Sequence, residues 1–373
     1  MKKLRKQLSI FACIILASAS IVTLSACGST PDTPDLPEVP AVTEEANDAN
    51  DANDANDAND ANDANDANDA DANDELYFQI GVIQLMEHPA LDAATEGFMA
   101  QLADEGINAH FDIQNGQRDV AILDTIASLF VGNEVDLVLA NGTLSAQSIA
   151  NATNTIPVVG VSITSFTEAG VVDSNELPGR NITGASDMNP IQAQIEMILE
   201  FFPDVETIGL LYSSNEANSV YQASLARDII EELGLASDSA TITSAADLQQ
   251  VATSLAGNVD VIYVPTDNAI AGAMGVMANI SAETSTPVFA GEENMTMGGG
   301  IATLSVNYYE LGRQAGRMAA QVLRGEAEPA TMPIQFAERY NYIVNGFMVD
   351  LLGIEVPEQY QAYITMPEED EDE

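Results

Sequence analysis

The chain has 373 residues, of which 46% are hydrophobic, and its 58 acidic and 11 basic residues give a formal net charge of -47. A surface this acidic repels polyanions, which argues against a nucleic-acid partner. The apolar fraction is sufficient for a sizeable core, and we interpret the charge as adaptation of the solvated surface to its medium, for example high external salt, rather than as binding chemistry.

A membrane-targeting leader opens the chain. Basic residues at positions 2–6 precede an apolar run at 10–21, which is too short to span a bilayer and ends in small residues, as a secretory signal does. The sequence Leu24-Ser25-Ala26-Cys27 resembles the lipobox of bacterial lipoproteins, in which the signal is removed before a cysteine that then carries a diacylglycerol. We therefore expect residues 1–26 to be removed and Cys27 to anchor the protein on the extracytoplasmic face of the cell membrane. The alternative is an ordinary cleaved signal. Because Cys13 lies in the leader, the mature chain can form no internal disulfide.

A polar segment separates Cys27 from the first apolar run. Proline alternates with acids at 31–40, and Ala-Asn-Asp repeats occupy 46–74. Residues 27–79 are therefore predicted to form a disordered acidic tether with a coil span of about 40 Å. A calcium-binding repeat is the alternative, but it would need glycine turns and a closing bidentate acid. The acidic residues 365–373 are likewise predicted to be a disordered tail.

From residue 80 the chain alternates short β-rich runs with amphipathic helical stretches, which indicates parallel sheets covered by helices. In the first half we expect strands at 80–85, 108–114, 136–140 and 157–161, and helices at 90–105, 118–131 and 144–151. In the second half we expect helices at 191–202, 219–233, 246–255 and 270–280, and strands at 207–212, 240–242, 261–264 and 287–290. Two successive units of this kind predict an α/β protein with two doubly wound, Rossmann-like lobes.

Polar turns follow most of these predicted strands. In doubly wound sheets, functional groups gather at the carboxyl ends of the strands. Hydroxyl groups and helix N-termini suit a carboxylate, and Asp or Glu side chains suit an ammonium group, so these turns together suit a zwitterion such as an amino acid. The alternative is that the Ser, Thr, Asn and Asp residues only cap the helices that follow them.

Four segments resemble a known family. Residues 83–92 (IQLMEHPALD), 216–219 (EANS), 263–268 (YVPTDN) and 308–312 (YYELG) resemble signature segments of the ABC-transporter substrate-binding lipoproteins related to bacterial tryptophan and tyrosine binding proteins. The resemblance implies a type I periplasmic-binding-protein fold, with lobe 1 formed by residues 80–186 and 302–336 and lobe 2 by residues 187–301 and 337–364. Crossing segments near 184–186, 302–304 and 335–338 would form the hinge.

The resemblance also implies a function. A member of this family captures an amino acid, with aromatic or apolar ones favoured, between its lobes and delivers it to an ABC permease driven by a separate ATPase subunit. We expect such a protein to be a lipid-anchored monomer that uses no cofactor or metal and catalyses no reaction.

Carried over residue by residue, the resemblance implies ligand contacts from both lobes. Asp267 is expected to bind the ammonium group, and Thr143 and Thr164, with the helix start that follows, are expected to bind the carboxylate. The full expected set is Glu87, His88, Thr143, Ala146, Gln147 and Thr164 from the first lobe and Ser214, Glu216, Asn218, Ser219, Asp267, and Glu292 or Glu293 from the second. After Thr164 the family's usual Asp-Pro is replaced by Ser165-Phe166, so Phe166 either stacks on a ligand ring or fills the core.

Three alternative functions remain open. The same fold could hold another small molecule, such as a sugar, a cation or a signalling compound, although the acids of the expected site disfavour an uncharged sugar. An enzyme would need a nucleophile with a base, but the chain has only two histidines, His88 and His110, and neither a Gly-x-Ser-x-Gly sequence nor a metal-binding histidine pair. A surface-tethered adhesin would depend on the long tether more than on the cleft.

Overall fold

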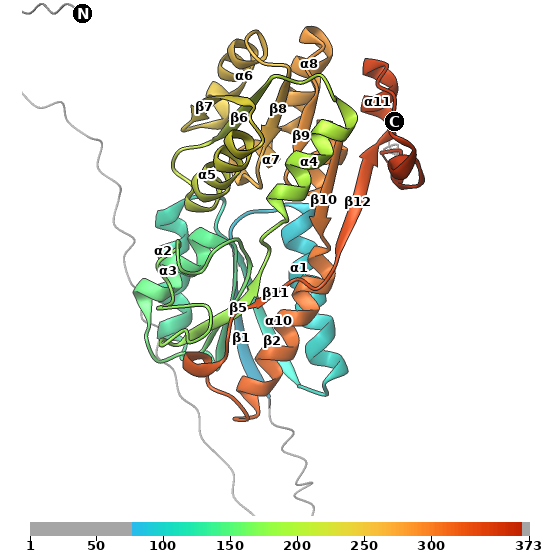
Figure 1. Cartoon of the computed structure of the whole chain (residues 1–373). Coiled ribbons are helices and arrows are strands. Elements are labelled where there is room, and N and C mark those ends of the chain that lie inside the picture. The colour runs from blue at the N-terminus through green and yellow to red at the C-terminus, as the bar shows by residue number, and fades with distance from the viewer. Residues whose placement is uncertain (1–76, 368–373) are drawn as a thin grey trace, which may run out of the picture. The chain divides into compact units, whose positions relative to one another are not determined.

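A parallel sheet forms the centre of the first lobe in the computed structural model, which describes residues 77–367. The strand order is β11-β5-β4-β3-β1-β2 (Figure 1). The strands are β1 (Phe78–Gln84), β2 (Ala109–Asn115), β3 (Leu137–Asn141), β4 (Val158–Ile163), β5 (Ile182–Ser186) and β11 (Gln335–Phe336). The chain reverses its winding direction between β1 and β3, and a doubly wound sheet opens a crevice at the carboxyl edge of that point.

Helices cover both faces of this sheet. α1 (Pro89–Asp104) and α10 (Tyr308–Leu323) pack on one face, and α2 (Val120–Gly132) and α3 (Thr143–Ala152) pack on the other. Alternate strand residues supply the two cores, because successive side chains of a strand point to opposite faces. Val82 and Leu139 join the core under α1 and α10, whereas Ile83 and Ala140 join the core under α2 and α3.

Glycines allow α1 and α10 to approach each other closely. A Cβ atom at Gly97 would lie 2.0 Å from the carbonyl oxygen of Tyr309, and a Cβ atom at Gly312 would lie 2.0 Å from that of Ala94. A side chain at either position would force the helices apart, since packed interiors have no spare volume. This contact attaches α10, which comes late in the sequence, to the first lobe.

The second lobe repeats the same architecture around a parallel sheet in the order β7-β6-β8-β9. Its strands are β6 (Thr207–Ser213), β7 (Ala236–Ile242), β8 (Val261–Val264) and β9 (Val288–Ala290). Its helices are α4 (Ile191–Phe201), α5 (Ala217–Glu232), α6 (Leu248–Ala256), α7 (Asn268–Ala271), α8 (Met274–Thr284) and α9 (Glu293–Gly299), with a 3-10 turn at Ala245–Asp247. The helix expected over 270–280 is divided at residues 272–273, because α7 begins early, at the cap supplied by Asp267.

A small third sheet completes the second lobe. It joins β10 (Ala302–Val306) and β12 (Tyr340–Asn345) as antiparallel neighbours, and β13 (Ile364–Thr365) runs parallel to β12. The expected boundaries assign residues 302–306 to lobe 1, but β10 packs in the core that contains α4 and β6, because the chain enters it directly beside β9 through the bond from Ile301 N to Val288 O. The remaining helical segments are α11 (Gly346–Leu352) and 3-10 turns at Pro329–Thr331 and Glu358–Tyr363.

The chain passes between the lobes after β5, after β10 and after β11, close to the expected hinge segments (Figure 1). The predicted leader, Cys27 and the repeats at 46–74 lie outside the described residues. Phe78 already belongs to β1 and Thr365 to β13, so regular structure extends slightly into the expected tether and tail. Between residues 77 and 367, no helix has the length and apolar character needed to cross a membrane.

Candidate functional site

The carboxyl ends of strands from both lobes face one cavity. The turns after β1, β4 and β5 line it from the first lobe, and those after β6, β8 and β9 line it from the second, as expected for doubly wound sheets. Most of its side chains are polar, and α10 adds a tyrosine. The lining residues are His88, Ala90, Leu91, Ser162, Thr164, Asp187, Asn218, Thr266, Asp267, Asn268, Ala271, Glu292, Met295 and Tyr308.

The cavity is nearly closed. Its volume is about 20 Å³, which is room for about one water molecule. Gln222 Nε2 of α5 donates a hydrogen bond to Thr164 Oγ1 of the first lobe over 3.3 Å. Asn189 Nδ2, in the crossing segment after β5, donates to Thr266 Oγ1 of the second lobe over 3.3 Å. An amino acid can therefore enter only if the lobes separate, as in proteins that close around a hinge.

Carboxylates dominate the charge of the cavity wall. Asp187, Asp267 and Glu292 line it, whereas His88 is the one basic side chain among these described lining residues. Burial lowers the pKa of His88, although the charge of Asp92 opposes this effect. His88 is therefore mainly neutral at pH 7 and gives the acids no positive partner.

Burial weakens two of these acids. It raises the pKa of Asp187 to about 6, although hydrogen bonds from Thr164 and Tyr308 act in the opposite direction. Burial also raises the pKa of Glu292 to about 7, against the hydrogen bonds that its carboxylate accepts at the start of α9. Both groups carry charge near neutral pH in surroundings that disfavour charge. A cationic group placed in the cavity would stabilise them.

Two carboxylates organise the short helix α7. Asp267 is its N-cap and accepts hydrogen bonds from Ile270 N at 2.9 Å, Ser213 N at 2.6 Å and Ser213 Oγ at 2.9 Å. Glu216, at the N-cap of α5, accepts from the first two N–H groups of α7 at 3.0 Å each. Burial and the charge of Asp267 raise the pKa of Glu216. These contacts fix the position of the second-lobe wall.

The first lobe presents a strained strand residue beside a helix without a side-chain cap. Ser162 has a φ of 56°, next to an irregularity in the pairing of β4 with β5, and its buried Oγ finds no hydrogen-bond partner among the described residues. Gly142 precedes α3 without a side-chain cap, and its N–H donates to Val161 O over 3.0 Å, which places the start of α3 next to Ser162. Free backbone N–H groups and an unpartnered hydroxyl suit an anion such as a carboxylate.

The structure brings together some of the expected site residues and separates others. The cavity is lined by His88, Thr164, Asn218, Asp267 and Glu292. Four other expected residues do not line the cavity but lie on elements close to it in the sequence or structure. Thr143 is the first residue of α3, Glu216 caps α7, Ser219 Oγ donates to Thr266 O over 3.4 Å, and Glu293 is the half-buried first residue of α9. Glu87 and Ser214 are exposed, Ala146 lies in the core, and Gln147 Nε2 donates to Ala169 O over 3.0 Å.

Nine of the fourteen lining residues were absent from the expected set, among them Asp187, Ser162 and Tyr308. Asp187 directly follows β5, so its place at the carboxyl end of a strand was the available signal. Ser162 is the second-last residue of β4, and Tyr308 is the first residue of one of the four segments that resemble the family. Phe166 is fully buried in the first-lobe core, where its ring would meet a Cβ at Gly160 within 2.7 Å, so it fills the core and does not face the cavity.

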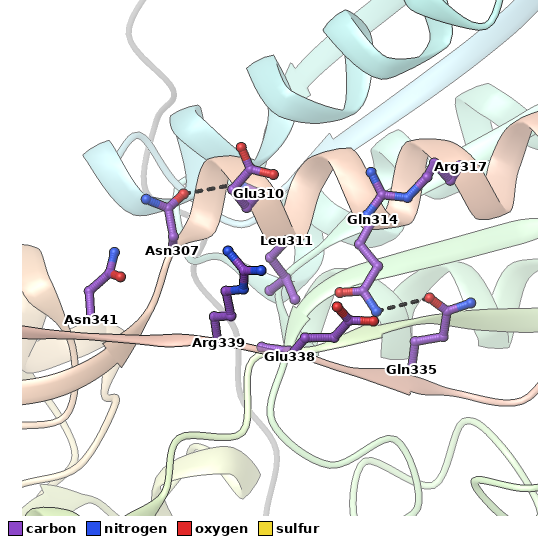
Figure 2. Close-up of a pocket in the computed structure, with 10 residues that line it drawn as sticks. Asn307, Glu310, Leu311, Gln314, Arg317, Gln335, Glu338, Arg339 and Asn341 are labelled. Carbon is purple, nitrogen blue, oxygen red and sulfur yellow. Dashed lines mark hydrogen bonds between the residues drawn. The ribbon is translucent and has the colours of Figure 1, made fainter.

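A second hollow lies on the surface between α10 and the segment that links β11 to β12 (Figure 2). Glu310 and Glu338 offset Arg317 and Arg339 there, and all four side chains are exposed. Gln314 Nε2 donates across it to β11 over 2.9 Å. Of these two hollows, the interlobe cavity is the one that combines burial with carboxylates that lack a positive partner among its lining residues, so it is the stronger candidate for a ligand site.

Comparison with protein families gives an independent result. Residues 79–366 match the family of ABC transporter substrate binding proteins. The tyrosine-binding protein of Clostridioides difficile (strain R20291) is 36% identical over 270 residues, which is 71% of this chain and 78% of that protein. A leucine binding protein from Thermotoga maritima shares the fold, which is that of the type I periplasmic binding proteins. It is 11% identical, with a TM-score of 0.54 over 66% of this chain and 83% of that chain.

This chain also resembles two solved structures, one described as a ligand complex and the other as ligand-free and open. An ABC domain in complex with L-Trp from Streptococcus pneumonia is 33% identical, covers 78% of this chain and 99% of its own, and gives a TM-score of 0.75. The ligand-free, open structure of a substrate binding protein with adhesive properties from Clostridium difficile is 35% identical, covers 78% and 98%, and gives a TM-score of 0.63. The TM-score is therefore higher for the structure described as an L-Trp complex than for the one described as ligand-free and open.

Proposed function

Because the chain belongs to the family of ABC transporter substrate-binding proteins, we propose that it binds an aromatic amino acid in the cavity between its lobes. The observation that carries the proposal is a buried cavity, at the strand ends of both lobes, whose carboxylates lack a positive partner among its lining residues. An amino acid supplies the missing ammonium group. The aromatic class is supported by relatives described as a tyrosine-binding protein and as a complex with L-Trp.

The cavity offers chemically distinct surfaces for the other two parts of such a ligand. Ser162 and the N-terminus of α3 would bind the carboxylate, because free N–H groups and the helix dipole both favour an anion. Leu91, Ala271 and Met295 form the apolar part of the wall and would contact the side chain. A methionine sulfur makes favourable contacts with aromatic rings.

Delivery at a membrane is the second part of the proposal. We place the mature protein on the extracytoplasmic face of the cell membrane, anchored through Cys27, where as a monomer it hands its ligand to an ABC permease and its ATPase. The basic and apolar leader followed by the lipobox-like sequence supports this placement. The protein would act by binding and closure alone, without catalysis, as its family of solute-binding proteins suggests.

Ligand fluorescence tests the proposed binding directly. The chain contains no tryptophan, so all indole emission in the sample comes from the added L-tryptophan, and a change in that emission reports binding. We expect saturable binding of at least one aromatic amino acid when the purified protein is titrated with L-tryptophan by fluorescence and with tyrosine, phenylalanine and leucine by calorimetry. No binding to any of the four, at low and at high salt, would refute the amino-acid assignment.

Adhesion is a second candidate function. The Clostridium difficile relative at 35% identity is described as having adhesive properties, and the tether expected at residues 27–79 would hold the lobes away from the membrane. Equal attachment of ligand-free and ligand-saturated protein to immobilised matrix proteins would support it. No attachment in either state would exclude it.

A further inference from the structure

The acids that line the cavity differ in the donors that hold them. Asp267 accepts three hydrogen bonds, two of them from backbone N–H groups of Ser213 and Ile270. Glu292 likewise accepts from two backbone N–H groups at the start of α9, at 2.5 and 2.8 Å, and from one side-chain amide at 3.2 Å. Both carboxylates cap helices and already accept from fixed backbone donors, although burial still raises the pKa of Glu292.

Asp187 is held in a different way. It is only 3% exposed, and its two carboxylate oxygens accept from hydroxyl groups, Oδ1 from Thr164 Oγ1 and Oδ2 from Tyr308 OH, each over 3.0 Å. The only backbone N–H group that also acts on this carboxylate among the described residues is its own. Burial and the neighbouring charges of Asp187 and Glu292 raise the pKa of Tyr308 well above its usual value, so its hydroxyl remains a donor. The salt bridges among residues 77–367 all lie elsewhere, so none of them compensates Asp187.

These three side chains form a cluster of acceptors that faces the cavity. A hydroxyl that donates one hydrogen bond keeps lone pairs with which it can accept another. A compact ammonium group has three N–H donors and no acceptor, so it can bond to the carboxylate and to both hydroxyls at once. The pKa of Asp187, at about 6, leaves this carboxylate mostly ionised at neutral pH, whereas Glu292, at about 7, is only half ionised.

We propose that Asp187, assisted by the hydroxyls of Thr164 and Tyr308, binds the ammonium group of the ligand and thereby selects amino acids over their deaminated analogues. This assignment rests on the proposed amino-acid binding and replaces Asp267, which the sequence favoured for the role. The primary-amine subsite therefore lies on the segment that crosses from the first lobe to the second, not on the second-lobe wall.

The position of Asp187 connects the subsite to both lobes. Two residues further along the same crossing, Asn189 Oδ1 accepts from Val306 N over 2.9 Å in the neighbouring crossing strand, and its amide donates to Thr266 of the second lobe. Thr164, which donates to Asp187, also accepts from Gln222 of the second lobe. An ammonium group bound at Asp187 is therefore in direct contact with the hydrogen-bonded network that joins the closed lobes.

Paired ligands and variants test the assignment. L-tryptophan and indole-3-propionate differ by the amino group alone, and both fluoresce in a protein that has no tryptophan. We expect Asp187→Asn to weaken L-tryptophan binding about 10- to 100-fold and to change indole-3-propionate binding by less than about threefold, because only the first ligand loses a charge-assisted contact. Asp204→Asn, at an exposed acid far from the lining residues, is the matched control and should bind both ligands like the wild type.

The outcomes separate this assignment from the proposed function. Unchanged tryptophan binding by Asp187→Asn, or an equal loss for both ligands, would overturn the assignment, since an equal loss indicates a general effect on the cleft. If the wild type binds tyrosine in place of tryptophan, tyrosine and 3-(4-hydroxyphenyl)propionate form the test pair by calorimetry, with the same expectation. Failure of the wild type to bind any aromatic amino acid would instead refute the proposed function itself.

Discussion

Asp187→Asn is expected to stabilise the ligand-free protein, and to do so more strongly as the pH rises. Burial raises the pKa of Asp187 from 3.8 to about 6 in the folded protein. A carboxyl group with a raised folded-state pKa binds more protons in the folded than in the unfolded chain, so stability falls as pH increases between these two values. Asparagine keeps the shape of the side chain and its oxygen acceptor but does not titrate, so the variant lacks this loss.

The expected magnitude follows from the same pKa. A rise from 3.8 to about 6 corresponds to about 3 kcal/mol of unfolding free energy once the pH exceeds the folded-state value. At about pH 5 roughly half of this loss has developed, so the advantage of the variant should grow by roughly 1.5 kcal/mol between about pH 5 and pH 8. The change with pH isolates the titration, because the effect of altered hydrogen bonds at Asp187 is largely independent of pH.

Urea unfolding of both proteins without ligand, at about pH 5 and pH 8, measures this difference. Both conditions avoid the isoelectric point near 4.1, where the chain carries little net charge and associates more readily. Asp204→Asn, at an exposed acid, serves as the control and should show no comparable growth. An advantage of Asp187→Asn that stays constant, or that shrinks toward pH 8, would refute the view that Asp187 is ionised without adequate compensation.

Three other perturbations address the packing of α1 against α10, the strained backbone at Ser162 and the acidic surface. Gly312→Ala should lower the unfolding free energy by about 3 kcal/mol in urea titrations, because its Cβ would lie 2.0 Å from a backbone oxygen of α1. Gly275→Ala, in α8, is the control: its Cβ would have nothing within 4 Å, so the unfolding free energy should stay the same or rise by up to about 1 kcal/mol. Equal effects of the two substitutions would refute the close-packing argument. Ser162→Gly should raise the melting temperature, because it removes the strain of a left-handed serine backbone, which is about 1 kcal/mol. The same variant should bind amino acids more weakly in calorimetry, because it lacks the unpartnered hydroxyl, and unchanged affinity would remove Ser162 from the carboxylate site. Raising the salt concentration from about 0.1 to 1 M should increase the melting temperature of a chain with a net charge of -47, and no increase would contradict adaptation to a salty medium.

The fold was largely predictable because its signals are local. Hydrophobic runs of strand length between amphipathic stretches identify each α/β unit, and the strand expected at 261–264 coincides with β8. The break between α7 and α8 was not predictable in this way, because it depends on caps supplied by Asp267 and, from a distant turn, by Glu216. Periodicity records which face of a helix is buried, but it does not record which distant side chain caps it.

The site was less predictable because its chemistry depends on long-range contacts. Asp267 and Asp187 look alike in the sequence, as acids that follow strands. The structure gives the oxygens of Asp267 to donors on a neighbouring strand 54 residues away, and it gives Asp187 a tyrosine hydroxyl 121 residues away. Only the folded chain distinguishes an acid that caps a helix from an acid that faces the cavity and is held mainly by two hydroxyl groups.

Charge also connects ligand binding to closure of the lobes. In the closed form, burial raises the pKa of Asp187 to about 6 and that of Glu292 to about 7, so both charges are disfavoured there. Near pH 7 the ligand-free closed form therefore either takes up protons or buries uncompensated charge, at about 3 kcal/mol for Asp187 alone compared with a solvated carboxylate. An ammonium group at Asp187 removes this cost only in the closed form, so it supplies the difference in affinity that a ligand needs in order to shift the two-state equilibrium. A deaminated analogue with the same ring and carboxylate lacks that difference, so closure itself discriminates between them.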